Sequence, residues 1–272
     1  MGQIQASDGT DIHYHVWGAP HKPALLLLQG LGCDAHGWIF QRLALARHYR
    51  CIALDNRGVG KSGAPAGPYS IEQMARDAVT VLDAEGVARA NVMGISMGGV
   101  VSQLLAIKYP ERVNSLVLAA TAGRHHGWRI QLLARWQYLA VRYGMTKVAL
   151  AVVPWFVGTR ARQLLGPTAA LTVRALLPNS AHAFASQIEA ILEVPDELRE
   201  HHARVDVPTC LIVGGLDRLT PPEDSLELAK RLPHGRLTVI PEVGHALIAE
   251  APRQYNHAVL AFLSRHGALS VT

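Results

Sequence analysis

Short, continuous apolar runs recur along this chain, with stretches of helical periodicity between them. Four of the runs lie in the first half of the chain, namely ALLLLQ (24–29), RCIALD (50–55), NVMGI (91–95) and VNSLVLAA (113–120). Runs of this kind are typical of strands that are buried on both faces of a parallel sheet. Because parallel strands need long crossover connections, the pattern predicts an α/β fold with a doubly wound sheet.

Further segments extend this sheet at both ends of the chain. IQAS (4–7) and DIHYHVW (11–17) predict two strands joined by the turn Asp8-Gly9. TCLIVGG (209–215) and RLTVIPE (236–242) predict two more strands late in the sequence. We therefore expect a mostly parallel sheet of eight strands.

The alternation of strands and helices is interrupted between residues 124 and 205. This segment has helical patterns and many aromatic residues, namely Trp128, Trp136, Tyr138, Tyr143, Trp155, Phe156 and Phe184. We predict that residues 1–123 and 206–272 form an α/β core and that residues 124–205 form an inserted helical cap. The cap is expected to lie over the carboxyl ends of the strands, where open α/β sheets bind ligands.

The sequence GISMG (94–98) places Ser96 between two glycines, directly after a predicted strand and before a predicted helix. A side chain at either glycine would clash as the strand and the helix fold back around the serine. The motif has two interpretations, a tight structural turn or a nucleophile elbow that exposes the hydroxyl of Ser96. A nucleophilic serine needs a base within reach and an acid that orients this base.

Two polar residues follow later strands in the order that such an elbow requires. Asp217 and His245 each lie just after a predicted strand, so both would stand at the same edge of the sheet as Ser96. We predict Ser96 as the nucleophile, His245 as the base and Asp217 as the orienting acid. The chain has 14 histidines, so a histidine alone indicates little. His36, near the loop after the strand 24–29, is the runner-up for the base.

These three residues and the segments around them resemble the α/β-hydrolase superfamily. The similar segments are LDNRGVGKS (54–62), DRLTPP (217–222) and GHALIAEAPRQYNHAVLAFL (244–263). The resemblance implies the α/β-hydrolase fold, with an eight-stranded sheet and an inserted helical cap. It also implies an oxyanion hole formed by the backbone N–H groups of Leu31 and Met97.

Three other positions near these segments carry structural expectations. Gln29 stands where many members of the superfamily have histidine, and it is expected in the pocket wall near the oxyanion. Asp55 and Arg57 are close together in the loop after a strand, so we expect them to pair and to brace this turn.

The identity of the nucleophile and the flanking segments narrow the substrate class. Related dehalogenases and epoxide hydrolases carry aspartate where this chain has Ser96. Residues 65–87, 94–106 and 110–123 are similar to 3-oxoadipate enol-lactonases and related small esterases. We expect the substrate pocket to be lined by Gln29, Trp38, Trp128, Trp136, Trp155 and Phe156. In the alternative interpretation, the aromatic residues of the segment 124–205 only pack its helices together.

Together these features predict a serine hydrolase that cleaves carboxylic esters or lactones of small, fairly apolar substrates through an acyl-enzyme. This chemistry needs no metal and no organic cofactor. Two alternatives stay open. The triad can serve another reaction, such as perhydrolysis, acyl transfer, carbon–carbon bond hydrolysis or a lyase step. The protein can also be a non-catalytic ligand-binding protein on a hydrolase scaffold, because fold does not fix function.

Composition argues against other classes of partner. The net charge is +5, but no basic run alternates with aromatic residues, so we expect no nucleic-acid partner. The most apolar window, residues 139–158, contains two charged residues and a proline, so we expect no stable membrane insertion. The first residues lack the pattern of a secretory signal, and Cys33, Cys51 and Cys210 lack disulfide or metal spacing. We therefore expect a cytoplasmic protein with a small-molecule ester or lactone as its partner, and a homo-oligomer stays open.

Overall fold

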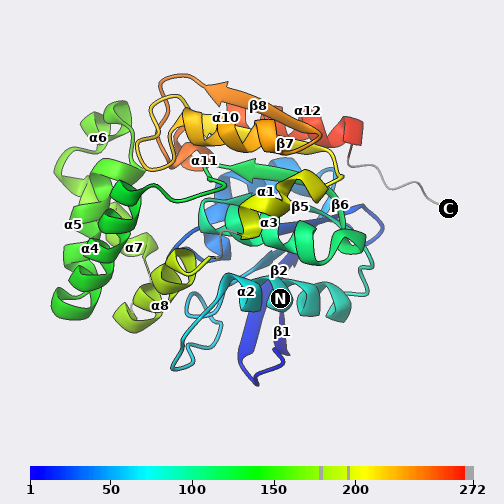
Figure 1. The fold of residues 1–272 in the computed structure, drawn as a ribbon, viewed down its shortest axis with the longest axis horizontal. Coiled ribbons are helices and arrows are strands. Elements are labelled where there is room, and N and C mark those ends of the chain that lie inside the picture. Colours follow the sequence, from blue (N-terminus) through cyan, green and yellow to red (C-terminus); the bar gives the residue numbers. More distant parts are fainter. Residues whose placement is uncertain (178–179, 195–196, 267–272) are drawn as a thin grey trace.

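The chain folds around one twisted sheet of eight strands. The computed structural model describes residues 1–177, 180–194 and 197–266 (Figure 1). The strand order is β1-β2-β4-β3-β5-β6-β7-β8. The strands are β1 (Gly2–Gln5), β2 (Asp11–Trp17), β3 (Ala24–Leu28), β4 (Arg50–Leu54), β5 (Ala90–Ile95), β6 (Val113–Ala119), β7 (Thr209–Gly214) and β8 (Gly235–Ile240). The β1–β2 and β2–β4 pairs are antiparallel and the other pairs are parallel, which confirms the predicted mostly parallel α/β sheet.

The burial of the strands explains their sequences. Every residue of the central strands β3 and β5 is buried. The edge strand β1 instead alternates between partly buried and exposed residues. A central strand that is covered on both faces needs an apolar or uncharged side chain at every position, so its sequence is a continuous apolar run.

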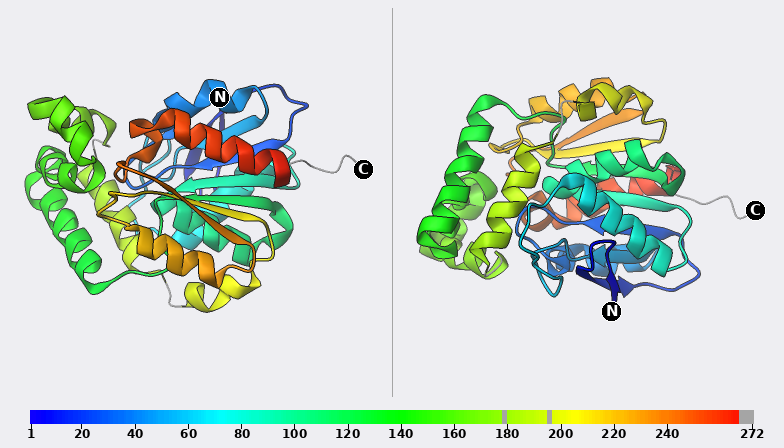
Figure 2. Two further views of the ribbon diagram at one scale, coloured as in Figure 1. Left: turned by 90° about the horizontal axis from the view of Figure 1, so that it is seen from above. Right: turned by 60° about the horizontal axis from the view of Figure 1, so that its bottom comes forward.

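Helices cover both faces of the sheet, and Figure 2 shows the two helical layers. One layer consists of α2 (Ile71–Ala84), α3 (Met97–Lys108) and α10 (Pro222–Arg231). The other consists of α1 (Ile39–Ala46), α11 (Leu247–Glu250) and α12 (Pro252–His266). The buried side chains of the two layers belong to two separate apolar clusters, with Leu105 in the first and Tyr255 in the second. Short 3-10 helices are η1 (Ala35–Trp38), η2 (Pro110–Arg112), η3 (Gly166–Thr168) and η4 (His202–Arg204).

Between β6 and β7 the chain leaves the sheet, and the regular elements described there are helices. These helices are α4 (Gly127–Tyr143), α5 (Met145–Phe156), α6 (Thr159–Leu165), α7 (Ala169–Leu176), α8 (Ala181–Leu192) and α9 (Glu197–His201). Helices α4 to α7 stand to one side of the sheet, on the left in Figure 1. The division into a core and a cap domain at residues 124 and 205 stays a prediction.

The apolar window at residues 139–158 is divided between two helices. Helix α4 ends at Tyr143, α5 begins at Met145, and Gly144 lies between them with φ of 77°. Among the described residues, no helix combines the length and the apolar character that a membrane span requires.

Candidate active site

Ser96 lies at a sharp turn between a strand and a helix. Strand β5 ends at Ile95 and α3 begins at Met97, and Ser96 between them has φ of 53°, in the left-handed region that non-glycine residues rarely adopt. A Cβ at Gly94 would collide with the carbonyl oxygen of Gly98. This close approach explains why the motif needs glycine at position 94. The positive φ of Ser96 is a backbone strain of the kind that clusters at functional sites.

The side chains of Ser96, His245 and Asp217 form a continuous hydrogen-bonded chain. Ser96 Oγ lies 3.1 Å from His245 Nε2, and His245 Nδ1 lies 2.8 Å from Asp217 Oδ2. Asp217 and His245 are both almost completely buried. The structure therefore brings together the three residues that the sequence analysis predicted. His36, the alternative candidate for the base, lies outside this chain of hydrogen bonds.

The carboxylate of Asp217 is held in one orientation by its own loop. Its Oδ1 accepts the N–H groups of Leu219 and Thr220, both at 2.9 Å, and its Oδ2 accepts the hydroxyl of Thr220 at 2.9 Å. An oriented carboxylate beside Nδ1 favours the imidazole tautomer with its proton on Nδ1. Nε2 of His245 is then free to accept the proton of Ser96.

The two backbone N–H groups predicted to bind an oxyanion belong to residues that line the same cavity as Ser96. Met97 is the first residue of α3, so its N–H has no acceptor inside the helix. The N–H of Leu31 makes no backbone hydrogen bond within the part of the chain that the structure describes. Gly30 lies against Ser96, since a Cβ there would be 3.3 Å from the Cβ of Ser96. The loop after β3 thus brings Leu31 to the wall of the same cavity as Ser96.

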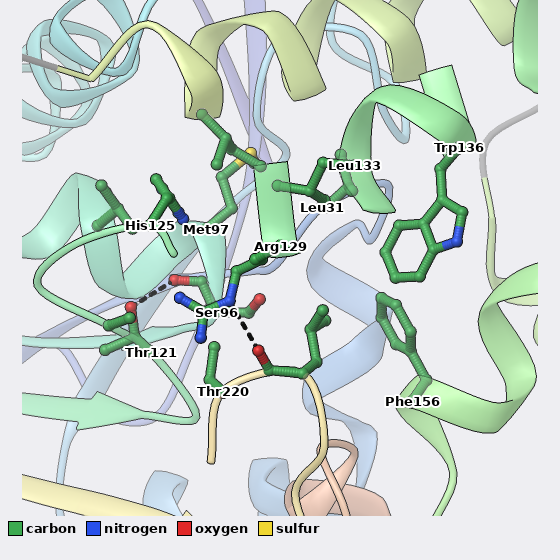
Figure 3. A pocket seen from close by; sticks show the side chains of 14 residues that line it. Leu31, Ser96, Met97, Thr121, His125, Arg129, Leu133, Trp136, Phe156 and Thr220 are labelled. Carbon is green, nitrogen blue, oxygen red and sulfur yellow. Dashed lines mark hydrogen bonds between the residues drawn. The ribbon is translucent and has the colours of Figure 1, made fainter. Parts of the chain in front are cut away.

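A cavity of about 40 Å³ opens beside Ser96 (Figure 3). Its lining is mostly apolar, with Trp136 and Phe156 side by side on one wall. The full lining is Leu31, Ser96, Met97, Val100, Thr121, Ala122, His125, Arg129, Leu133, Trp136, Phe156, Ile191, Leu219 and Thr220. Trp136 and Phe156 thus lie where the sequence analysis expected pocket residues.

The other expected pocket residues do not line this cavity. Trp38 is fully buried in the apolar cluster between the sheet and the layer of α1 and α12, so it belongs to the core. The rings of Trp128 and Trp155 stack on each other at 5.8 Å, and Trp128 is 41% exposed. These two indoles therefore pack against each other and do not line the cavity. The side chain of Gln29 turns back to accept the N–H of Gly30 at 3.2 Å.

Asp55 and Arg57 brace the turn after β4, but the expectation that they pair with each other is wrong. Arg57 binds Asp77 and Asp8, each at 2.9 Å, and is almost completely buried. Asp55 instead accepts the N–H of Ala35 at 2.8 Å and other nearby donors. The two side chains have separate partners because helix α2 brings Asp77 directly to the guanidinium of Arg57.

Arg129 is a buried residue of the cavity wall that sequence reasoning missed. Its guanidinium forms an ion pair with Asp224 and donates to the carbonyl of Leu219 at 2.8 Å. His126 Nε2 lies 3.0 Å from the other carboxylate oxygen of Asp224. These bonds fasten the start of α4 to the loop that carries Asp217. An arginine in a helix gives no sequence signal for such a role, because its partners lie far away in the chain.

His125 is the second missed residue of the cavity wall. Its Nδ1 is buried and makes no hydrogen bond within the described residues. Burial lowers the pKa of His125 to about 4, so the imidazole is neutral near pH 7. A neutral, unpaired ring nitrogen in an apolar cavity is available to a polar group of a ligand.

The loop that carries His245 is fastened to the end of α5. The N–H of Ala246 donates to the carbonyl of Phe156 at 2.9 Å, and the ring of Phe156 contacts the ring of His245 with centroids 5.2 Å apart. The carboxylate of Glu250 accepts the N–H of Gly158 at 3.2 Å and that of Gly244 at 3.4 Å. The position of the imidazole therefore depends on contacts from the segment between β6 and β7.

Comparison with known proteins places this chain among the alpha/beta hydrolases. The sequence profile of the alpha/beta hydrolase fold matches residues 23–151. 3-Oxoadipate enol-lactonase 2 of Acinetobacter baylyi is 33% identical to this chain, over 93% of each protein. A protein of Azorhizobium caulinodans that carries the name carbamate hydrolase RutD is 32% identical, over 93% of this chain and 95% of that protein. The crystal structure of the enol-lactonase from Burkholderia xenovorans superposes with a TM-score of 0.90 at 30% identity, over 97% of this chain and all of that one.

Proposed function

This chain belongs to the alpha/beta hydrolase family, and we propose that it cleaves small carboxylic esters or lactones with Ser96 as its nucleophile. The observation that carries this proposal is the chain of hydrogen bonds from Ser96 Oγ through His245 to Asp217. The enol-lactonases among its relatives support the substrate class.

In the proposed mechanism, His245 Nε2 takes the proton of Ser96 as Oγ attacks the carbonyl carbon. Asp217 stabilises the resulting imidazolium. The oxyanion receives hydrogen bonds from the N–H groups of Leu31 and Met97. When the tetrahedral intermediate collapses, the imidazolium gives its proton to the leaving alkoxide and the acyl group stays on Ser96 as an ester.

The second half of the reaction repeats these steps with water. His245 takes a proton from a water molecule as its oxygen attacks the acyl-enzyme, and the same two N–H groups bind the new oxyanion. Collapse of this intermediate breaks the bond to Ser96 Oγ, which takes the proton back from His245. The carboxylic acid leaves and the enzyme is restored. For a lactone, the leaving alkoxide and the acid belong to one product.

The dimensions and lining of the cavity support a short, apolar acyl group. A cavity of about 40 Å³ is far smaller than the several hundred Å³ of a drug-sized ligand site. Trp136 on the wall of this cavity is only 1% exposed, so it is closely surrounded by other side chains. We expect acetyl and propionyl esters, or small lactones of similar size, to react faster than long-chain esters.

The decisive experiment compares Ser96→Ala with a control serine. A fluorophosphonate probe should label the wild-type chain once and should fail to label S96A. S96A should lose at least about 10³-fold in kcat on p-nitrophenyl acetate. Ser264→Ala, which removes an exposed hydroxyl on α12, should leave both readouts unchanged. Full turnover by S96A would refute the proposal.

A carbamate is the second candidate substrate, because one relative carries the name of a carbamate hydrolase. The same relay can attack a carbamate carbonyl, so the geometry alone favours neither substrate. A panel of esters, lactones and carbamates with matched acyl size separates them by kcat/KM. Product analysis with added peroxide or alcohol distinguishes hydrolysis from perhydrolysis and acyl transfer.

A further inference from the structure

A cluster of imidazoles and a carboxylate lies apart from the cavity beside Ser96. His13 and His15 occupy alternate positions of β2, so their side chains project from the same face of the strand. Asp55 follows β4, and its backbone N–H donates to the carbonyl of His13 at 2.9 Å. One nitrogen of each imidazole and one carboxylate oxygen of Asp55 all lie within 4.8 Å of one another. His36, in η1, contacts His15 with ring centroids 5.2 Å apart.

We propose that His13, His15 and Asp55 bind one divalent transition-metal ion of the zinc type, with His36 as a fourth ligand. Imidazole nitrogens together with a carboxylate oxygen are the donor set that Zn²⁺ prefers in proteins without cysteine ligands. The site is separate from the proposed hydrolytic reaction, which uses no metal, and the inference does not rest on that reaction. The sequence analysis expected no metal ligand among these residues.

The spacing of the groups is close to that of a tetrahedral site. Two ligands at 2.0–2.1 Å from a tetrahedral ion are about 3.4 Å apart, and two imidazoles on it have ring centroids about 5 Å apart. His13 Nδ1 and Asp55 Oδ2 are separated by 3.1 Å, so an ion can take the place of the proton between them. The ring centroids of His13 and His15 are 4.8 Å apart. One nitrogen of the half-buried His15 lies within 4.8 Å of the ligand atoms of His13 and Asp55.

His15 lacks a protein partner for a buried polar atom. Its Nε2 is shielded from solvent and makes no hydrogen bond within the described residues. An unsatisfied buried nitrogen destabilises the fold unless a ligand satisfies it. A metal ion between His15 and Asp55 would satisfy it.

The groups around the cluster hold its ligands in place. Asp55 accepts the N–H of Ala35 at 2.8 Å and the N–H of Lys61 at 3.0 Å, which fixes the plane of its carboxylate. His36 Nδ1 lies 3.3 Å from Asp34 Oδ2, so the atom of this exposed imidazole that would bind the metal is Nε2. Outer hydrogen bonds of this kind are typical of metal sites, because they set the tautomer and direction of each ligand. An ion here would tie β2, the end of β4 and the loop of η1 together.

The test uses the untagged full-length chain after removal of metal with a chelator. Addition of Co²⁺ should give the visible absorption of a site with nitrogen and oxygen ligands, and calorimetry with Zn²⁺ should give one ion per chain. His15→Gln should weaken binding by about tenfold or more, and His36→Ala should weaken it less. Zn²⁺ should raise the unfolding temperature of the wild-type chain and should not raise that of H15Q.

His234→Ala is the matched control. His234 also has a carboxylate partner, Asp206 at 2.9 Å, but it is exposed and lies next to β8, at the opposite edge of the sheet. H234A should bind the metal as the wild-type chain does. His13→Gln provides a second variant, and circular dichroism shows that each variant is folded. The absence of saturable binding at millimolar metal, or equal binding by the wild-type chain and a folded H15Q, would overturn the proposal.

Discussion

Asparagine at position 217 tests the proposed proton relay sharply, because the structure decides which way its amide must point. Oδ1 of Asp217 accepts two backbone N–H groups, those of Leu219 and Thr220. The amide oxygen of Asp217→Asn must keep this place, since an NH₂ group there would face two donors. The NH₂ group then takes the place of Oδ2, which lies 2.8 Å from Nδ1 of His245.

In D217N the amide therefore donates to Nδ1 and stabilises the tautomer of His245 with its proton on Nε2. This tautomer cannot accept the proton of Ser96, whose Oγ lies 3.1 Å away. In a triad of this type, fixing the wrong tautomer lowers kcat about 10⁴-fold, which corresponds to about 5.5 kcal/mol. Asp217→Ala supplies no such donor, and the hydroxyl of Thr220 at 3.2 Å from Nδ1 can still accept its proton. We therefore expect D217A to retain more activity than D217N.

The assay is kcat/KM on p-nitrophenyl acetate for the wild-type chain, D217N, D217A and Thr220→Val. T220V is the matched control, because it removes a hydroxyl from the same loop and keeps the carboxylate. We expect activity to fall in the order wild type, T220V, D217A, D217N. Nitrogen NMR of the His245 ring reports the tautomer directly. Activity of D217N within tenfold of the wild-type chain, or above that of D217A, would refute the reasoning.

Three residues outside the proposed relay give further expectations. Burial lowers the pKa of His125 from 6.5 to about 4. The stability contributed by the neutral ring is therefore present above pH 6.5 and is lost as the pH falls toward 4. Urea unfolding between these pH values should show a loss of up to about 3 kcal/mol in the free energy of unfolding, and this loss should be absent in His125→Gln. Glu250→Ala leaves the N–H groups of Gly158 and Gly244 without their acceptor, and urea unfolding should show a loss of about 2 kcal/mol that Glu250→Gln partly restores. Trp136→Phe enlarges the cavity, so the ratio of kcat/KM for p-nitrophenyl propionate over acetate should rise about fourfold, and an unchanged ratio would count against this assignment of the acyl site.

The backbone positions of the site could be predicted from the sequence because the sheet topology fixes them. Ser96, Asp217 and His245 each follow a strand, and adjacent parallel strands end at one edge of the sheet. The position of each residue just after a strand, together with the motif around Ser96, therefore predicted that they meet, and the structure puts them within hydrogen-bond distance. Their role in catalysis stays a prediction.

The lining of the cavity could not be predicted in this way, because it depends on how each side chain turns. Trp136 points into the cavity, whereas Trp128 in the same helix stacks on Trp155 outside it. Trp38 follows the loop after β3 closely, yet it packs into the core on the other side of the sheet. Aromatic content identifies a segment with much apolar surface, but it does not say which surface the cavity receives.

The prediction that Asp55 and Arg57 pair was wrong for a related reason. Arg57 is two residues from Asp55 in the sequence, but its partners Asp77 and Asp8 come from a helix and from a hairpin turn. Local distance along a loop predicts a pair only when both side chains point the same way. His13 and His15 are two apart on β2 and share a face, a pattern that the sequence analysis did not use.

Phe156 links the chemistry of the site to its selectivity. Its ring lines the cavity and contacts the ring of His245. Its carbonyl accepts the N–H of Ala246, the residue that directly follows His245. A change in the segment between β6 and β7 that reshapes the cavity is therefore expected also to move the imidazole of His245, the proposed base. Because a displacement of about 1 Å in a reacting group is enough to lower a rate about 10²-fold, changes there should alter kcat together with substrate preference. Exchange of this segment between relatives should for this reason give low activity unless the contacts of Phe156 with the loop of His245 are kept.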